Sequence, residues 1–508
     1  MNWNSLHRLK LLLLVTLTLS LLGLQLAAEN NKEVHRFERA EVLFKQGELS
    51  TAKKELQGYL DQHPVSLQGL ILLAKLFLAE DDFDKATQQI QLALKQAPSD
   101  GEALATYGHC LLRDGDFAMA EAQFRKSLQI DSKQADAYLG LGRLHLTKQQ
   151  SNESLEAFQK AIHLAPEQED NYFFASEAYG AKKNYSKQIE SLEKYVSLKP
   201  KLNEERVRNA EALLSFFRSF EKQQIARIVK SSLSYEIPFQ PFYGLMIVEG
   251  HVNGEGPFRF LVDSGATSTV LSNSLIEELK IPIISTAVVK CVGGSGKTGA
   301  KLCKAEKLKI GDLQIDNLPV SSFDNTIFAG LIDGVLSTAD LADFLITLDY
   351  PDQKIQLTPG SKAAVIKSSP KSSPDVIQID FRILGNLILV PIAINRQNVR
   401  NFLFDTGAVT SALSKRQAAI LGVHEDSPNS TVDIQFAGAC GVTQSVLSVE
   451  RVDLGLAKFK MDFAQILAVD LKEISKERRT EVSGILGADF YSNRKVMIDY
   501  QNLKLTLE

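Results

Sequence analysis

The strongest constraint on the fold is a 34-residue period over the first 200 positions. Prolines fall on four marks of one 34-residue grid, and small or apolar residues recur 8, 12 and 24 positions before most marks. A fixed period of this length predicts stacked copies of one supersecondary unit, because each copy buries its apolar face only against its neighbours. The prolines are Pro64, Pro98, Pro166 and Pro200, and Ser132 stands at the remaining mark.

The pattern resembles the tetratricopeptide repeat, in which small residues let two helices pack closely and a proline follows the second helix. It covers residues 33–200 and predicts five repeats, with departures at Ser132, His145 and Gln188. Such arrays form solenoids whose concave face commonly binds peptides or protein partners, so the resemblance implies a docking surface; a spacer or a dimerisation arm is the alternative. An apolar helical period continues through residues 201–231, which predicts a capping helix and linker.

The N-terminus has the order typical of a secretory signal. Arg8 and Lys10 precede an apolar run, and small residues follow it before a polar stretch. Residues 1–28 are therefore predicted to be a signal peptide, with an uncleaved membrane anchor over residues 11–28 as the alternative. Both alternatives predict an exported protein, periplasmic or secreted in the first case and membrane-anchored in the second.

The composition of the chain argues against several classes of binding partner. The chain has 57 basic and 61 acidic residues, a net charge of −4 and no long run of one sign, so we expect no nucleic-acid partner. Four cysteines are too few for a disulfide scaffold and lack the paired spacing of a zinc site, and the histidines form no ligand cluster. We therefore expect neither a metal nor another cofactor.

Beyond Ser232 the pattern becomes strand-like: short segments rich in β-branched and aromatic residues, separated by Gly and Pro. Two such regions follow one another, over residues 234–360 and 376–508. The stretch between them, residues 361–375, is rich in Ser, Pro and Lys, which is typical of an exposed linker. The sequence thus predicts two all-β lobes after the helical array.

The two β regions are copies of one design. In each, an apolar strand leads into an Asp-[Ser/Thr]-Gly-Ala segment, and Leu245 precedes Asp263 at the same spacing as Leu387 precedes Asp405. Later, the segment 334–337 corresponds to the segment 484–487, and an Asp-Tyr pair follows in both copies. A single Asp-Ser-Gly or Asp-Thr-Gly is most often a plain turn, whereas two of them in duplicated contexts are a strong signal.

These segments resemble the retropepsin family of aspartic proteases, with both halves in one chain as in pepsins. The resemblance covers residues 234–508. It implies a multidomain fold class, in which an all-α tetratricopeptide solenoid precedes an all-β, two-lobed aspartic protease fold. It also implies that Asp263 and Asp405 are the catalytic residues and that a peptide or protein is the substrate.

The chemistry of such a pair follows from electrostatics. Two carboxylates held about 3 Å apart do not both ionise, so one keeps a proton while the other is charged. The charged member deprotonates a water that attacks the peptide carbonyl, and the protonated member donates to the carbonyl oxygen. The sequence leaves open which Asp carries the proton. The leading hypothesis is an exported aspartic endopeptidase whose repeats dock proteins, and the alternative is a catalytically inactive peptide-binding or scaffold protein.

Residues beside each Asp fit supporting roles. Gly265 and Gly407 allow a tight turn and a close approach of the backbone to the carboxylates. The resemblance implies that Ser264 and Thr406 hydrogen-bond to the opposite loop, and the alternative is that each hydroxyl satisfies only its own turn.

Two Gly-rich segments lie where the family places substrate-covering flaps. Glycine suits a hairpin tip that moves and approaches a peptide closely. A phosphate-binding loop is the disfavoured alternative, because neither segment opens a helix with the Lys-Ser/Thr ending of a P-loop. The predicted flap residues are Gly293, Gly294 and Gly296 in the first segment and Gly438 and Gly441 in the second.

Two features stay open. Ser337 stands where the second copy has a glycine, which puts the packing under the first catalytic loop in doubt. Cys291 and Cys303 flank the first flap, and both a disulfide and two buried thiols fit that placement. If the repeats serve only for docking, removal of residues 33–200 is expected to spare cleavage of short peptides.

Overall fold

The computed structural model describes residues 34–201, 204–220, 223–229, 234–292, 296–323, 330–360, 376–427, 431–432, 436–439, 441–443 and 446–508. The predicted signal segment 1–28 and the predicted linker 361–375 lie outside the described residues. The chain divides into two compact units, residues 1–111 with 118–137 and residues 112–117 with 138–508. Among the residues described, no helix is long and apolar enough to cross a membrane.

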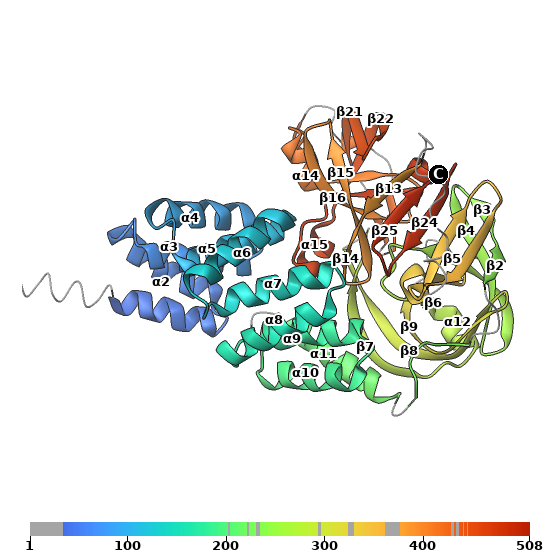
Figure 1. Cartoon of the computed structure of the whole chain (residues 1–508), viewed down its shortest axis with the longest axis horizontal. Helices are drawn as coiled ribbons and strands as arrows, with labels where there is room; N and C mark the ends of the chain where they lie inside the picture. Colours follow the sequence, from blue (N-terminus) through green and yellow to red (C-terminus); the bar gives the residue numbers. More distant parts are fainter. Residues whose placement is uncertain are drawn as a thin grey trace, which may run out of the picture. The chain divides into compact units, whose positions relative to one another are not determined.

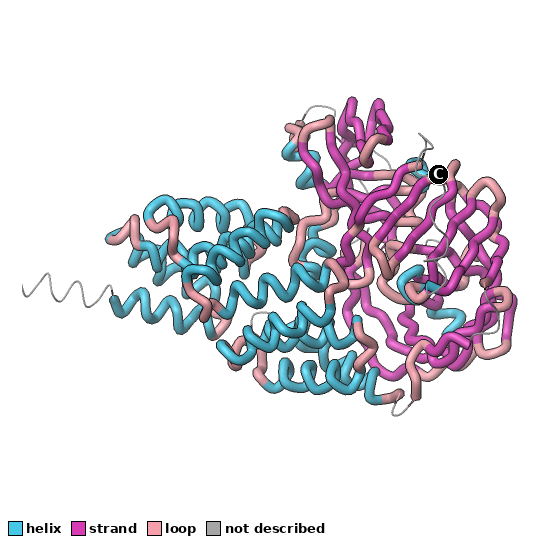
Figure 2. Tube along the Cα trace, in the orientation of Figure 1, coloured by secondary structure: helices cyan, strands magenta, loops and turns pink. Residues whose placement is uncertain are grey.

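Helical hairpins occupy the first part of the chain, as the 34-residue period predicts (Figures 1 and 2). Residues 34–45 are helical, and the helices that follow are α2 (Leu49–Gln62), α3 (Leu67–Ala79), α4 (Phe83–Gln96), α5 (Gly101–Asp114), α6 (Phe117–Ile130), α7 (Ala135–Thr147), α8 (Ser151–Leu164), α9 (Glu169–Ala181), α10 (Tyr185–Ser197) and α11 (Glu204–Arg218).

The small residues of the period mark places where two helices touch. A Cβ added at Gly108 would lie 2.5 Å from the ring of Phe124, and one at Gly142 would lie 2.4 Å from the ring of Phe158. Both phenylalanines are fully buried. Because a buried ring has no room to move aside, glycine is required at these two crossings.

The first lobe is built on a sheet that contains nine strands in the described part of the chain, in the order β1-β9-β6-β10-β5-β4-β8-β7 with β3 paired to β4. The segment predicted as capping helix and linker thus also supplies an edge strand, β1. The elements are β1 (Arg227–Val229), β3 (Gln240–Phe242), β4 (Leu245–Val252), β5 (Glu255–Asp263), β6 (Val270–Ser272), α12 (Asn273–Glu278), β7 (Ile283–Lys290), β8 (Lys297–Ile310), β9 (Leu313–Phe323), β10 (Gly334–Ser337) and the 3₁₀ helix η1 (Thr338–Leu341).

The second lobe repeats this plan. Its sheet has the order β14-β15-β16-β23-β17-β22-β21-β18 among the described strands, and β19 pairs with β20 in a separate hairpin. The elements are β14 (Arg382–Leu384), β15 (Leu387–Ile394), β16 (Asn398–Phe404), β17 (Ala412–Ser414), α14 (Lys415–Ile420), β18 (Thr431–Val432), β19 (Phe436–Gly438), β20 (Gly441–Thr443), β21 (Val446–Leu456), β22 (Phe459–Val469), α15 (Lys472–Arg478), β23 (Gly484–Leu486) and α16 (Ala488–Tyr491).

A six-stranded sheet joins the lobes in the order β13-β25-β24-β11-β12-β2. β11 of the first lobe pairs antiparallel with β24 of the second, with Thr347 opposite Met497 at the centre. Each lobe thus contributes three strands to this sheet in mirrored order. Their bounds are β2 (Tyr235–Pro238), β11 (Phe344–Asp349), β12 (Lys354–Pro359), β13 (Ile377–Asp380), β24 (Lys495–Asp499) and β25 (Lys504–Leu507).

Helix α11 and the last repeats pack directly on the β lobes. Ala212 and Phe216 of α11 share a buried cluster with Leu302 of β8. The Asn209 side chain exchanges two hydrogen bonds, of 2.8 and 2.9 Å, with the backbone of Val288 in β7. These contacts fix the strand that leads to the predicted first flap.

The half-buried Asp170 of α9 is paired with Arg206 of α11 and with Arg479, which follows α15 of the second lobe. Although burial opposes ionisation, the two guanidinium groups lower the pKa of Asp170 to about 2. Removing one partner of a buried ion pair leaves an uncompensated charge, which is strongly destabilising. In contrast to the sequence-based expectation, we therefore expect removal of residues 33–200 to destabilise the lobes.

Candidate active site

The two predicted catalytic carboxyls stand at the ends of equivalent strands. Asp263 is the last residue of β5, and Asp405 follows directly after β16. A parallel neighbour supports each strand: Ser337 of β10 lies opposite Asp263, and Leu486 of β23 lies opposite Phe404. Both loops therefore leave their sheets in the same way, as the duplication predicts.

A reciprocal set of hydrogen bonds joins the two loops. The Ser264 backbone N–H donates to the Thr406 hydroxyl at 2.9 Å, and the Ser264 hydroxyl donates to the Phe404 carbonyl at 2.7 Å. In the opposite direction, the Thr406 N–H donates to the Ser264 hydroxyl at 3.0 Å, and the Thr406 hydroxyl donates to the Val262 carbonyl at 2.9 Å. Both side chains are buried, so the hydroxyls link the lobes instead of satisfying only their own turns.

The carboxyl groups of Asp263 and Asp405 lie within hydrogen-bonding reach of each other. Each is also held by its own loop, because the Gly265 N–H donates to Asp263 Oδ1 at 2.6 Å and the Gly407 N–H donates to Asp405 Oδ1 at 2.9 Å. Each glycine also touches the Asp of the other lobe. The space that a Cβ would need at either glycine is already filled by a carboxyl group.

Burial is the main cause that raises the pKa of both carboxyls. The pKa of Asp263 is raised well above its ordinary value, because the charge of Asp405 adds to the cost of burial. The N–H groups of the two glycines act in the opposite direction. Two like charges in contact away from water do not both ionise, so the pair keeps one proton at a pH where separate carboxyls have lost both.

Ser337 does not loosen the first catalytic loop. Its buried hydroxyl donates to the Ala266 carbonyl at 2.6 Å, and its backbone N–H donates to the Thr269 hydroxyl at 3.2 Å. In the second lobe a Cβ at Gly487 would lie 2.5 Å from the backbone of Thr410. Position 337 therefore has room for a side chain below its catalytic loop, whereas position 487 has none. In the first lobe, the serine uses this room to add a hydrogen bond to the loop.

Two carboxyls that support the catalytic loops were missed in the sequence. Asp340 accepts hydrogen bonds from the backbone N–H and hydroxyl of Thr269, at 2.8 and 2.7 Å. Asp489 accepts the same two bonds from Ser411, at 2.9 and 2.6 Å. Thr269 and Ser411 stand at the same offset from the catalytic-loop Asp of their own lobe, and this match between the copies could have pointed to them.

Asp340 gives the fold a dependence on pH. Burial raises its pKa from the ordinary 3.8 to about 6. A raised pKa means that the stabilisation is complete when the group is protonated, below about pH 4, and is lost as the pH rises through 6. Asp340→Asn keeps a neutral acceptor for Thr269 and does not titrate. The difference in unfolding free energy between the variant and wild type should therefore shift by about 3 kcal/mol in favour of the variant when the pH is raised from 4 to 8.

Urea unfolding at the two pH values, followed by circular dichroism, measures this difference. Asp426→Asn is the control, because Asp426 is exposed. An Asp340→Asn variant whose stability relative to wild type does not change with pH would show that Asp340 is not the titrating group.

The predicted flaps are described only in part. Gly293 and Gly294 lie outside the described residues. Gly296 has a positive φ of 74° and accepts a hydrogen bond from the Cys291 N–H at 3.1 Å, which links the residue after β7 to the residue before β8. In the second segment, Gly438 of β19 pairs with Gly441 of β20 across a tight hairpin, as predicted for a flap.

The first hairpin is fixed near its tip by charge. Lys290, at the end of β7, forms ion pairs with Glu205 of α11 and, at 3.2 Å, with Glu473 of α15 in the second lobe. Its side chain is only 9 % exposed, so the lysine of both pairs is shielded from water, whereas the two glutamates are half-buried. The hairpin is thus tied both to the helical array and to the opposite lobe.

The cysteines follow neither predicted alternative. Cys303 is a free, buried thiol, and burial raises its pKa to about 11. Cys291 is disulfide-bonded. Cys291 and Cys303 therefore do not pair, although they flank the same hairpin.

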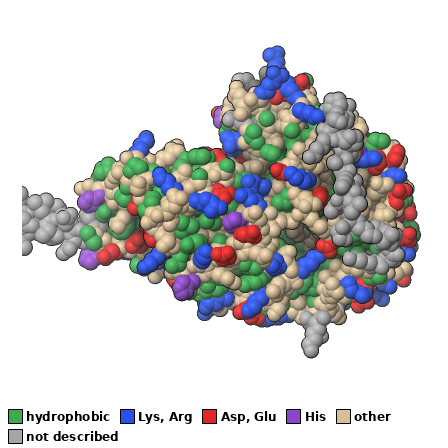
Figure 3. All heavy atoms as spheres, in the orientation of Figure 1, with side chains coloured by type: hydrophobic (Ala, Val, Ile, Leu, Met, Phe, Trp, Pro, Cys, Tyr) green, Lys and Arg blue, Asp and Glu red, His purple; other side chains and the backbone are tan. Residues whose placement is uncertain are grey.

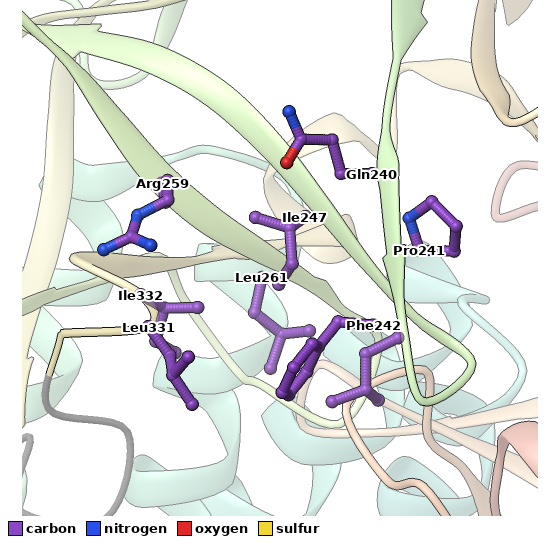
Figure 4. A pocket seen from close by; sticks show the side chains of 9 residues that line it. Gln240, Pro241, Phe242, Ile247, Arg259, Leu261, Leu331 and Ile332 are labelled. Atoms are coloured by element: carbon purple, nitrogen blue, oxygen red, sulfur yellow. The ribbon is translucent and has the colours of Figure 1, made fainter.

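An apolar pocket of about 130 Å³ lies on the first-lobe sheet (Figure 4). Its apolar lining includes Phe242, Leu245, Ile247, Leu261, Leu331 and Ile332, and Arg259 forms one wall. Phe260 and Val262 of β5 face the main core, whereas Leu261 belongs to a separate small cluster. Because strand side chains alternate, Leu261 shares its face with Asp263, two residues or roughly 7 Å further along.

No group of three or more His, Cys, Asp or Glu residues able to hold a metal ion occurs within the described ranges. Figure 3 shows basic and acidic side chains intermixed on the face in view.

Comparison with known protein families divides the chain into a helical repeat region and a two-segment β region, as the structure does. A family model described as aspartyl protease matches residues 248–339 and 390–490, one segment around each Asp. Tetratricopeptide repeat models match residues 37–101, 71–135, 108–169 and 169–202. A search of curated proteins found no match.

Solved structures similar to the chain are tetratricopeptide proteins or proteins with such arrays. TTC0263, a thermophilic tetratricopeptide protein of Thermus thermophilus, is 17% identical over 36% of this chain and 99% of its own, with a TM-score of 0.32. YrrB, a protein with an unusual peptide-binding site, is 19% identical over 34% and 91%, with a TM-score of 0.24. MamA is 16% identical over 33% and 92%, with a TM-score of 0.24. These TM-scores are too low to carry an argument about this chain.

Proposed function

Because the chain carries tetratricopeptide repeats over residues 37–202 and a retropepsin-like aspartyl protease domain over residues 248–490, we propose that it is an exported aspartic endopeptidase. The observation that carries this proposal is the contact between the carboxyls of Asp263 and Asp405, each with a raised pKa. A binding groove has no use for two buried like charges in contact, whereas hydrolysis of a peptide bond needs an acid and a base at one point.

The mechanism uses the shared proton of the pair. The ionised carboxyl removes a proton from a water held between Asp263 and Asp405, and the resulting nucleophile attacks the peptide carbonyl carbon. The protonated carboxyl donates to the carbonyl oxygen, so charge on the tetrahedral intermediate is neutralised as it forms. The carboxyl that took the proton from water then donates it to the amide nitrogen as the C–N bond breaks, and the other carboxylate takes back a proton from a hydroxyl of the intermediate, which restores the singly protonated pair. The hydrogen bonds of Ser264 and Thr406 hold the two carboxyl-bearing loops fixed relative to each other.

The repeats are proposed to dock protein substrates or partners, in keeping with the general use of such arrays. Export is proposed from the order of basic, apolar and small residues before Glu29. A disulfide at Cys291 supports this location, because disulfides persist mainly in oxidising compartments.

The test is hydrolysis of a mixture of peptides between pH 3 and pH 8, read by mass spectrometry. We expect cleavage that is maximal while the pair holds one proton. Because burial raises the pKa of both carboxyls above 3.8, that proton is lost only at higher pH, so cleavage should continue above pH 4 and fall towards the alkaline end.

A chain carrying both Asp263→Asn and Asp405→Asn is the control for contaminating peptidases. If wild type cleaves nothing at any pH, or if the double variant cleaves equally well, the enzyme proposal fails. Peptide binding without cleavage would then favour the inactive scaffold.

A further inference from the structure

The residues that line the apolar pocket of the first lobe have counterparts in the second lobe, because the lobes are duplicated. Residues near Asp263 correspond to residues at the same distance from Asp405, and residues near Gly334 correspond in the same way to residues near Gly484. The pocket residues Gln240, Arg259 and Leu331 therefore correspond to Arg382, Asn401 and Glu481. These three residues mark the corresponding position in the second lobe, which we call the second-lobe pocket.

In the second lobe this position is covered by Arg113–Phe117, a segment of the same compact unit. The Glu481 N–H donates to the Arg113 carbonyl at 2.7 Å, and the Asn401 side-chain amide donates to the Gly115 carbonyl at 2.9 Å. The Arg382 guanidinium lies 4.6 Å from the centre of the Phe117 ring. Two backbone carbonyls and one aromatic side chain of the segment are thus bound, a combination that proteins often use to bind peptides.

Asp114 anchors the segment by charge. Its carboxylate pairs with Arg400 of β16 at 3.3 Å and with Arg416 of α14 at 2.9 Å. The first lobe has Phe258 and Ser274 at the corresponding positions, so it has no cations there for an equivalent acidic residue. The second-lobe pocket is therefore built for this segment, whereas the first-lobe pocket is not.

Exposure at the two mouths agrees with this difference. Phe242 and Leu331 at the first mouth are 38% and 42% exposed, whereas their counterparts Leu384 and Glu481 are 7% and 5% exposed. The open pocket of about 130 Å³ approaches the roughly 150 Å³ that accommodates a benzene ring. An aromatic or branched aliphatic side chain suits its lining.

We propose that Arg113–Phe117 is a built-in occupant of the second-lobe pocket, and that this pocket is consequently closed to substrate. Only the first-lobe pocket then binds a substrate side chain, and it selects a large apolar residue on one side of the cleaved bond. This inference rests on the proposed peptidase function. It adds that a segment of the helical array sets the specificity of the site by filling half of it.

The experiment uses peptides randomised on both sides of the cleaved bond, with the full-length chain. Wild type should show one apolar preference, about 10-fold or more over small polar residues, on one side only, because one hydrophobic pocket discriminates by that factor. Asp114→Asn and Phe117→Ala release the segment and should add a second apolar preference on the other side. Leu331→Glu places a charge at the first mouth and should remove the original preference.

Unchanged preferences in variants that still cleave would overturn the inference and leave the proposed function standing. Absence of cleavage by wild type would instead contradict the proposed function. In that case hydrogen exchange of the double Asn chain with a phenylalanine-containing octapeptide decides. In the double Asn chain, the inference requires that the peptide protects the amides of residues 331–332 from exchange and not those of residues 481–482. When Asp114→Asn is added to that chain, the peptide should protect residues 481–482 as well. The same protection with and without Asp114→Asn contradicts the inference.

Since Phe117 is buried, Phe117→Ala is also compared with Asp114→Asn for its melting temperature. Asp114→Asn keeps the shape of the segment and serves as the decisive variant if Phe117→Ala unfolds.

Discussion

Asp263→Asn is expected to lower kcat/KM by about 10²–10⁴-fold, the usual contribution of a positioned general acid or base. Asparagine has nearly the same shape as the carboxyl and still accepts the Gly265 N–H, so the loop should keep its conformation. What is lost is the titratable group that shares a proton with Asp405. Asp405→Asn should have the same effect, because the pair works as a unit.

The same substitution should stabilise the fold. Burial raises the pKa of Asp263, so the carboxyl contributes full stability below pH 3.8, and that stability is lost as the pH rises through the higher folded pKa. The asparagine side chain carries no charge at any pH, so the unfolding free energy of the variant should exceed that of wild type at neutral pH. The melting temperature should rise by about 2–4 °C per kcal/mol.

Steady-state kinetics on one cleaved peptide and thermal unfolding at pH 4 and pH 7 measure both effects. Asp426→Asn, a change at an exposed turn, should alter neither. Undiminished activity in Asp263→Asn would remove the dyad from the mechanism. Loss of activity together with a lower melting temperature would show that the variant is misfolded instead.

The sequence predicted much of the fold, because the fold is repetitive at two scales. The 34-residue period and the copied Asp-[Ser/Thr]-Gly-Ala segments each repeat a local pattern, and local patterns are what a single sequence displays. The helical array, the two-lobed β region and the family resemblances that follow from these patterns are confirmed. The meeting of the loops at Asp263 and Asp405 follows from the same duplication.

What the sequence did not predict depends on contacts between unlike segments. The pairing of Asp170 with Arg479 joins residues 309 positions apart, and neither residue belongs to a repeated motif. The contact of Arg113 with Glu481 has the same character. Cys291 and Cys303 flank one hairpin and yet do not pair, so proximity in sequence is misleading there.

The residues that support the catalytic loops were predictable from the sequence only in part. Thr269 and Ser411 occur at matching offsets, so the duplication contained the signal for the supporting carboxyls of Asp340 and Asp489. Those acids follow the copied segments 334–337 and 484–487 at unequal distances, because Asp340 lies within the 3₁₀ helix η1 and Asp489 within α16. A strict search for identical spacing does not find them.

Gly265→Ala and Gly407→Ala test the geometry of the site without touching a titratable group. A Cβ at Gly265 would lie 2.5 Å from Asp405 Cγ, and one at Gly407 would lie 2.6 Å from Asp263 Cγ. Each substitution in one lobe therefore displaces the carboxyl of the other lobe. The hydrogen bonds of Ser264 and Thr406 hold the backbones in place, so the carboxyl is the group that must move.

Displacing a catalytic group by about 1 Å costs on the order of 10²-fold in rate, and overpacking a buried site costs about 1–3 kcal/mol of stability. We expect both effects for each variant, measured by kcat/KM and by urea unfolding. Gly455→Ala in β21 is the matched control, since its Cβ would meet only ordinary contacts, the nearest at 3.6 Å. Activity equal to wild type in Gly265→Ala would mean that the two carboxyls do not need to be in contact for catalysis, which contradicts the shared-proton mechanism.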